Sequence, residues 1–94
     1  MIRKATYNWK QGVETVLEEK NLQRYKDIGR RIAFYRKSRG LSQEKLADLI
    51  GISKSYLSKI EAPSSEKFCS LTTLFDIADG LEVDIVELLR DEMD

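Results

Sequence analysis

The sequence predicts an all-α fold with five helices, and three observations support this prediction. Apolar residues recur every three or four positions in five segments, which is the spacing that gathers side chains on one face of a helix. Serine or aspartate precedes four of these segments and glycine follows two of them, as is typical of helix ends. No segment alternates apolar and polar residues between hairpin turns, so no strand is expected.

The first predicted helix spans residues 24–39 and is both amphipathic and basic. Gly40 follows directly and can adopt the left-handed conformation that ends a helix. A short apolar stripe within residues 1–22 predicts an N-terminal extension that is itself helical and runs on into the basic helix. The stripe consists of Val13, Val16 and Leu17.

Two short helices follow, with a tight turn between them. Ser42 offers a side-chain oxygen that can cap a helix over residues 43–50, and Ser53 offers another to a helix over residues 54–61. Gly51 lies between the two helices, where a turn this short needs a positive φ. The sequence therefore predicts two short helices held at an angle to each other.

The last third of the chain predicts a loop and two more helices. Residues 62–70 contain the only proline, which indicates a loop, and Ser70 can cap a helix over residues 71–81. A last short helix is expected to begin at Asp84. Glu87 follows three residues later, so Asp84 and Glu87 form a variant of the capping box.

The length and composition indicate one small domain. The chain has 94 residues, of which 41% are hydrophobic and 34% charged, as expected for a globular protein without a membrane span. We assign residues 1–22 to the extension, residues 23–90 to the folded domain and residues 91–94 to an acidic tail.

Several classes of function are disfavoured by what the sequence lacks. It contains no histidine and a single cysteine, Cys69, which removes the commonest general base and metal ligand and any internal disulfide. No secretory signal is recognisable, which favours a cytoplasmic location. We therefore expect no catalysis, no metal or other cofactor, no small-molecule ligand and no membrane association.

Charge is distributed unevenly along the chain. The formal net charge is zero, yet residues 1–40 hold eleven basic and four acidic side chains, whereas residues 41–94 hold five basic and twelve acidic ones. Blocks of like charge are often only solvated surfaces, but a basic block also favours the binding of anionic ligands.

Four stretches between residues 28 and 89 resemble, in order, the helix-turn-helix family of phage repressors, Cro proteins and Xre-type bacterial regulators. They are Gly40-Leu41-Ser42-Gln43-Glu44-Lys45-Leu46-Ala47, Gly51-Ile52-Ser53, Tyr56-Leu57-Ser58-Lys59-Ile60-Glu61 and Val83-Asp84-Ile85-Val86-Glu87-Leu88-Leu89. The resemblance covers about two thirds of the chain. It implies a compact repressor-like domain that binds double-stranded DNA as a homodimer on a pseudo-palindromic operator, acting as a transcriptional regulator and most simply as a repressor.

The resemblance also implies which residues meet DNA. The third predicted helix is expected to contact bases through its exposed face. This face carries short hydroxyls and cations suited to the major groove, on Lys54, Ser55, Ser58 and Lys59. Phosphates are expected to be contacted by Gln43, Lys45, Ser53 and Tyr56. Gln43 could also brace the first residue of the recognition helix, and Tyr56 could equally well pack inward. Arg36 and Glu61 are expected to form a structural salt bridge instead of reading DNA.

Three points stay open at this stage. The dimer interface is expected either on the last helix, through Ile85, Val86, Leu89 and Met93, or on the N-terminal apolar stripe, unless these residues only fill the core. The extension is interpreted as a strut, with a dimerisation element and an arm along DNA as alternatives. An antitoxin-like or other module that binds a partner protein is the alternative function.

Overall fold

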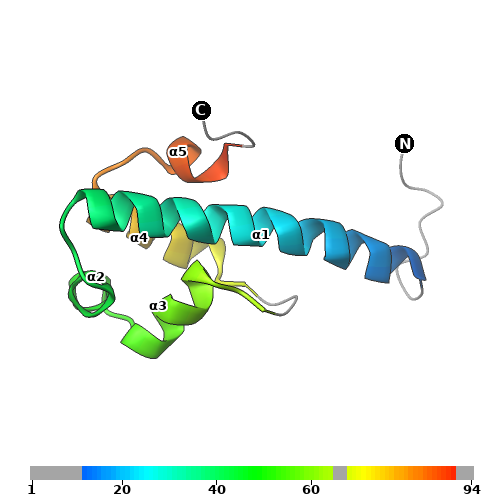
Figure 1. Cartoon of the computed structure of the whole chain (residues 1–94), viewed down its shortest axis with the longest axis horizontal. Helices are drawn as coiled ribbons and strands as arrows, with labels where there is room; N and C mark the ends of the chain where they lie inside the picture. Colours follow the sequence, from blue (N-terminus) through cyan, green and yellow to red (C-terminus); the bar gives the residue numbers. More distant parts are fainter. Residues whose placement is uncertain (1–11, 65–67, 91–94) are drawn as a thin grey trace.

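The computed structural model describes the backbone of residues 12–64 and 68–90 and the side chains from residue 21 onward. The described residues form five helices and no strand, which confirms the predicted fold class (Figure 1). The helices are α1 (Gly12–Ser38), α2 (Gln43–Ile50), α3 (Lys54–Glu61), α4 (Leu71–Leu81) and α5 (Ile85–Leu89). Expectations for residues 1–11 and for the tail 91–94, Met93 included, lie outside the described residues.

The long helix α1 is the central element of the molecule. Its 27 residues run without a break from the second half of the predicted extension through the basic segment. In Figure 1 the helices α2 and α3 lie on one side of α1, the short helix α5 lies on the other, and the N-terminal turns of α1 project beyond the domain. The longest dimension of the chain, 45 Å, follows from this projection.

Helices begin at the serine caps and end at the glycines that the sequence predicts. The Ser42 and Ser53 hydroxyls each accept a hydrogen bond of 3.0 Å from a backbone N–H of the first turn of α2 and α3. Ser70 does the same for α4 at 3.2 Å. Gly40 and Gly51 have φ angles of 72° and 79°, the left-handed values that a residue without a Cβ adopts at little cost.

The predicted capping box at the start of α5 is wrong. Asp84 stands at the N-cap position, but its side chain makes no capping hydrogen bond. Glu87 is engaged elsewhere, because its carboxylate accepts hydrogen bonds from the Tyr35 hydroxyl at 3.2 Å and from Arg90 at 3.0 Å. A partner on α1, which sequence spacing does not reveal, therefore replaces the local interaction.

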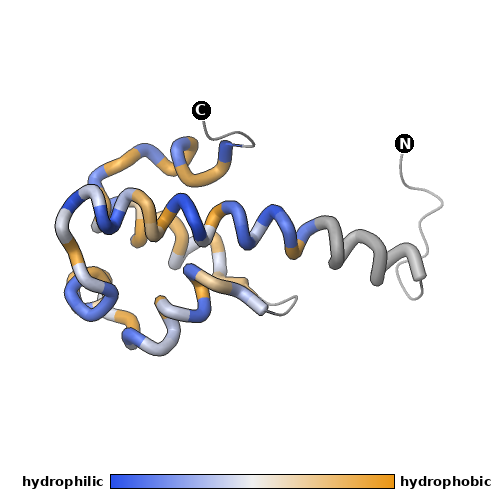
Figure 2. The backbone as a smooth tube through the Cα atoms, viewed as in Figure 1, coloured by the Kyte–Doolittle hydropathy of each residue, from blue (hydrophilic) through white to orange (hydrophobic). Residues whose placement is uncertain are grey.

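One apolar core holds all five helices together. Its members are Ile32, Leu46, Ala47, Leu57, Ile60, Leu74, Ile77, Ala78, Leu81 and Leu88, each with less than a tenth of its surface exposed. In Figure 2 hydrophobic segments of α4 and α5 lie beside the central part of α1. No helix among the described residues is long and apolar enough to cross a membrane.

The end of α4 combines an unusual backbone angle with a guanidinium cap. Glu82 follows the helix with a φ of 59° and a ψ of 45°, the left-handed conformation that glycine usually occupies. The Arg39 guanidinium donates to the Leu81 carbonyl at 2.7 Å and to the Glu82 carbonyl at 3.2 Å. Arg39 thereby ties the end of α1 to the end of α4.

Replacing Glu82 by glycine is expected to raise the free energy of unfolding by up to about 1 kcal/mol, because glycine adopts a positive φ without the steric cost of a Cβ. Denaturant unfolding of both proteins measures the difference. Asp79→Gly is the matched control, since the same residue inside the same helix is expected to lower the stability by about 1 kcal/mol. A Glu82→Gly protein less stable than the wild type would contradict the assigned conformation.

Candidate nucleic-acid interface

The helix α3 buries one face and exposes the other. Leu57 and Ile60 are 0% and 2% exposed, and they pack into the core that α1 and α2 contribute to. Eight residues are too few for a helix to be stable alone in water, so α3 takes both its existence and its orientation from these contacts.

A close backbone approach positions the end of α3 against α1. A Cβ built on Gly29 would lie 2.5 Å from the Glu61 carbonyl oxygen and 2.6 Å from that of Ile60. Contacts this short are not tolerated, so a residue with a side chain at this position would push α3 away from α1. Sequence reasoning missed this role of Gly29, and a glycine inside an otherwise helical pattern was the available signal.

A buried ion pair joins α1 to the same end of α3. The Arg36 guanidinium donates to the two Glu61 carboxylate oxygens at 2.7 Å and 3.0 Å, and to the Leu41 carbonyl at 2.8 Å. The two side chains are only 9% and 6% exposed. The residues expected to form a structural salt bridge thus lie in a bidentate contact, which is the geometry that best orients two groups.

Gln43, at the first turn of α2, completes this cluster. Its side-chain amide donates to Glu61 at 3.0 Å, so one carboxylate is held by both α1 and α2. Gln43 was expected to brace the first residue of the recognition helix, whereas its hydrogen bond is to Glu61, the last residue of α3. An amide nitrogen carries two hydrogens, which leaves Gln43 a second N–H to donate.

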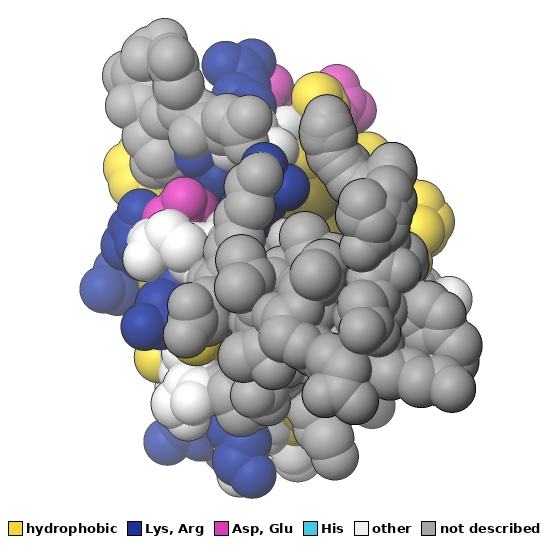
Figure 3. Space-filling view, turned by 90° about the vertical axis from the view of Figure 1, so that its right-hand side faces the viewer, with side chains coloured by type: hydrophobic (Ala, Val, Ile, Leu, Met, Phe, Trp, Pro, Cys, Tyr) yellow, Lys and Arg dark blue, Asp and Glu magenta, His cyan; other side chains and the backbone are white. Residues whose placement is uncertain are grey.

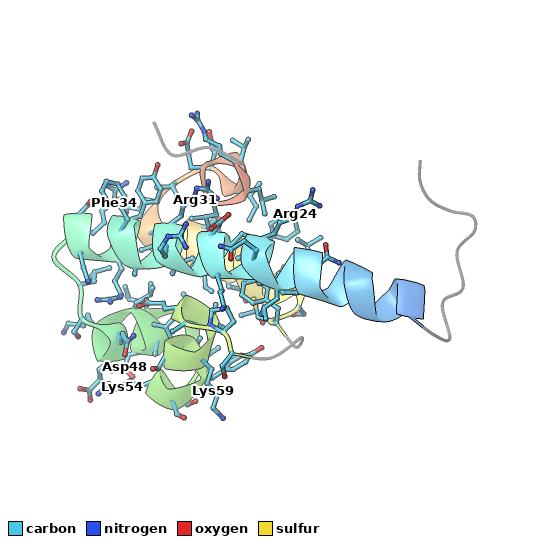
Figure 4. The ribbon with its side chains drawn as sticks, turned by 45° about the vertical axis from the view of Figure 1, so that its right-hand side comes forward. Arg24, Arg31, Phe34, Asp48, Lys54 and Lys59 are labelled. Carbon is cyan, nitrogen blue, oxygen red and sulfur yellow. The ribbon has the colours of Figure 1, made fainter. Side chains whose placement is uncertain are left out.

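The four expected base-reading side chains lie together on the open face of α3. Lys54, Ser55, Ser58 and Lys59 are all exposed. Among the described residues neither lysine forms an ion pair. Figure 4 places both lysines on the side of α1 opposite to α5, and Figure 3 shows Lys and Arg side chains gathered at the lower end of the molecule, where Figure 1 places α3.

The expected phosphate-contacting residues surround this face. Lys45 is exposed on the first turn of α2, and Ser53 lies at the N-terminus of α3 with its hydroxyl oxygen engaged in capping. Tyr56 is 38% exposed, so its ring is partly packed and partly available. Asp48 of α2 is exposed on the same side of α1, an acidic residue that the sequence reasoning did not single out (Figure 4).

The described residues offer little to other kinds of chemistry. They contain no group of three histidine, cysteine, aspartate or glutamate side chains that could hold a metal ion. Cys69 is half-buried, and this burial raises the pKa of its thiol to about 11. The thiol therefore stays protonated at neutral pH, where it is a packing group and a poor nucleophile.

Breaking the buried pair from one side is expected to destabilise the domain by about 3 kcal/mol or more, because the remaining charge stays buried without compensation. Arg36→Met and Glu61→Leu test the two sides, and the double variant should recover much of the loss because it leaves no buried charge. Denaturant unfolding of the three proteins gives a double-mutant cycle.

An exposed pair provides the control for this cycle. The Arg30 side chain is 61% exposed and contacts Asp27 at 2.5 Å. Replacing Arg30 by methionine should lower the free energy of unfolding by less than about 1 kcal/mol. If the double variant lost as much stability as the two single variants together, the two charges would not be coupled.

Comparisons with known proteins agree with this geometry. A family model described as helix-turn-helix matches residues 32–88. The HTH-type transcriptional regulator SlrR of Bacillus subtilis (strain 168) is 45% identical over 65 residues, which cover 69% of this chain and 42% of the relative. SinR of Bacillus licheniformis is 38% identical over 65 residues, covering 69% and 58%. The chain thus spans about half the length of these relatives.

Solved structures extend the similarity to the fold. A structure of SinR, the master regulator for biofilm formation, in complex with DNA superimposes with a TM-score of 0.62 at 40% identity, covering 67% of this chain and 98% of that one. The restriction-modification controller protein C.AhdI from Aeromonas hydrophila gives 0.62 at 33% identity, covering 68% and 90%. Sequence, fold and the arrangement of α2 and α3 therefore agree, and the chain belongs to the helix-turn-helix family of Xre-type transcriptional regulators.

Proposed function

We propose that this chain binds double-stranded DNA in a sequence-specific way through α3 and acts in the cytoplasm as a transcriptional regulator, most simply as a repressor. The observation that carries this proposal is the open face of α3, a helix held rigidly from behind, where two lysines that form no ion pair with any described residue flank two serine hydroxyls. A rigid helix of this width fits the major groove of B-form DNA, where base edges differ in their donors and acceptors.

Roles within the interface follow from the chemistry of each side chain. Lys54 and Lys59 can donate to guanine O6 and N7, whereas Ser55 and Ser58 can pair with any base and discriminate less. Lys45 and Tyr56, both exposed, would contact phosphates beside the groove. Gln43 braces Glu61 with one amide N–H and offers the other to a phosphate at the N-terminus of α2, where the helix dipole also favours an anion.

The comparisons support this proposal. SinR, which shares 40% of its residues with this chain over the aligned region, has been solved in complex with DNA. The named relatives are transcriptional regulators, so they favour DNA binding over catalysis and over a module that binds only a partner protein. A net charge of zero is compatible with this function, because affinity for DNA depends on the cations at the contact surface.

An unbiased selection of bound duplexes from a random pool, carried out at two salt concentrations, tests the proposal. Recovery of one sequence motif at both concentrations supports sequence-specific binding. Recovery of no motif, with binding that vanishes as salt rises, would overturn it and leave only non-specific attraction to phosphates.

Lys54→Ala and Lys59→Ala are each expected to weaken binding to the selected duplex by about 1–3 kcal/mol, which is the value of a lost base contact. Binding to a scrambled duplex of the same length should fall much less, which separates base reading from phosphate contact. Helical circular dichroism should not change, because both side chains are exposed. Unchanged affinity in both variants would remove α3 as the reading helix.

We further propose that the protein acts as a homodimer whose interface lies on α5 and the neighbouring part of α1. Val86 and Leu89 of α5 are 53% and 45% exposed, and Phe34 of α1 is 54% exposed. Phe34 packs edge to face on Tyr35, whose hydroxyl donates to Glu87 of α5, so the Phe34 ring is linked to α5 through Tyr35. Phe34 was not foreseen, and it enlarges the face expected from α5 alone.

Val86→Glu is expected to convert the dimer to a monomer and to weaken operator binding, because a buried carboxylate would be introduced at the interface. Sedimentation equilibrium measures the mass of the complex. Leu71→Glu is the matched control, since Leu71 is similarly exposed, at 59%, but belongs to α4. Loss of the dimer in Leu71→Glu and its survival in Val86→Glu would place the interface on α4 instead.

A further inference from the structure

A cavity of about 360 Å³ lies between α3 and the loop that leads to α4. Its volume is in the range of sites that bind small molecules. The residues that matter for its chemistry come from α3 and from the two ends of the loop, and they are Tyr56, Lys59, Ile60, Pro63, Phe68 and Cys69.

The walls of this cavity are held by the rest of the fold. Ile60 is 2% exposed and belongs to the apolar core, and Pro63 is buried. The Phe68 ring stacks on the ring of Tyr25 of α1, with centroids 4.8 Å apart and planes 5° from parallel. Both α3 and α1 therefore fix the walls, and the cavity exists before any ligand enters it.

The walls select a flat apolar body for the ligand. Phe68 and Tyr56 contribute aromatic rings, which pack well against other rings. Cys69 has a thiol whose pKa is raised to about 11, so at neutral pH it is protonated and behaves as a small apolar group. An aromatic ring that covers these side chains removes apolar surface from water, which favours binding.

The charge beside the cavity selects an anionic group. Lys59 lines the cavity, is exposed, and forms no ion pair with any residue that the structure describes. No aspartate or glutamate lines the cavity within the described part of the chain. The hydroxyl of Tyr56 can donate a hydrogen bond to the same anion that pairs with Lys59.

We propose that this cavity binds a small aromatic carboxylate, whose ring lies against Pro63 and Phe68 and whose carboxylate pairs with Lys59. The sequence predicts no small-molecule ligand, because the cavity exists only after the two ends of the loop have packed beside α3.

The sugar-phosphate backbone of DNA is the competing occupant. Its phosphates would suit Lys59, but a phosphate gains nothing from the apolar side chains of Ile60, Pro63, Phe68 and Cys69. An aromatic ring takes these side chains out of contact with water. The composition of the walls therefore favours the small carboxylate.

The consequence for regulation rests on the proposed DNA binding. Lys59 is proposed to contact a base and Tyr56 a phosphate, and both residues also line the cavity. A carboxylate that pairs with Lys59 withdraws this lysine from DNA. The ligand and the operator therefore compete, and the ligand releases the protein from its operator.

Naphthylacetate is the probe for the site, and Cys69 is the reporter. Cys69 is the only cysteine of the chain and lines the cavity, so its rate of alkylation by iodoacetamide measures occupation without DNA. At about nine times its Kd, naphthylacetate is expected to slow this reaction about tenfold, because only the unoccupied tenth of the molecules reacts. Naphthylacetamide has the same shape without the charge, and at equal concentration it should protect much less.

Lys59→Met removes the charge and keeps an unbranched side chain. In this variant naphthylacetate and its amide are expected to protect Cys69 equally, whereas in Lys54→Met, the matched control on the same helix, the preference for the carboxylate should persist. Alkylation that naphthylacetate does not slow would refute the site, and so would equal protection by the amide in the wild type. Protection by a DNA duplex but not by naphthylacetate would assign the cavity to the DNA backbone and overturn the proposal.

The release of DNA is tested by the affinity for the selected duplex with and without naphthylacetate. The ligand is expected to weaken wild-type binding about tenfold, within the range for a lost base contact. Cys69→Phe fills the cavity and should remove this response, and Cys69→Ala, which leaves the cavity open, should keep it. An undiminished response in a folded Cys69→Phe protein would overturn the proposal.

Two further controls keep the outcomes distinct. Helical circular dichroism identifies a Cys69→Phe protein that fails to fold, in which case the Lys59→Met comparison decides. Protection of Cys69 by naphthylacetate in a protein that selects no duplex would support the site and refute only the proposed DNA binding.

Discussion

The buried contact among Arg36, Glu61 and Gln43 is the constraint on which the rest of the molecule depends. It joins three helices at one carboxylate, and it holds the end of α3 at the point where Gly29 lets the two backbones approach. A buried ion pair contributes little net stability once desolvation is counted, but its directional hydrogen bonds select one orientation among several that the apolar contacts would accept. The direction in which α3 presents its lysines follows from that selection.

The helix α1 separates two surfaces with different tasks. One side receives α3 and the cluster around Glu61, and the other receives α5 through the hydrogen bond from Tyr35 to Glu87. Both sets of contacts are made by one uninterrupted helix (Figure 1). This arrangement leaves the proposed dimer interface and the proposed reading face on different sides of α1.

Local features could be predicted from the sequence, and features made by distant residues could not. The serine caps, the left-handed glycines and the five helices depend on neighbours within four positions, and the structure has all of them. The capping box at Asp84 failed because Tyr35, 52 positions earlier than Glu87, takes that carboxylate. The close approach at Gly29 and the hydrogen bond from Gln43 likewise exist only after α1, α2 and α3 are packed.

The small number of cations on the proposed reading face limits how tightly it can hold DNA of any sequence. Lys45, Lys54 and Lys59 supply three positive charges, and Asp48 lies on the same side of α1. Non-specific affinity for DNA grows with the number of phosphates neutralised, so a surface this modest depends on base contacts for most of its discrimination.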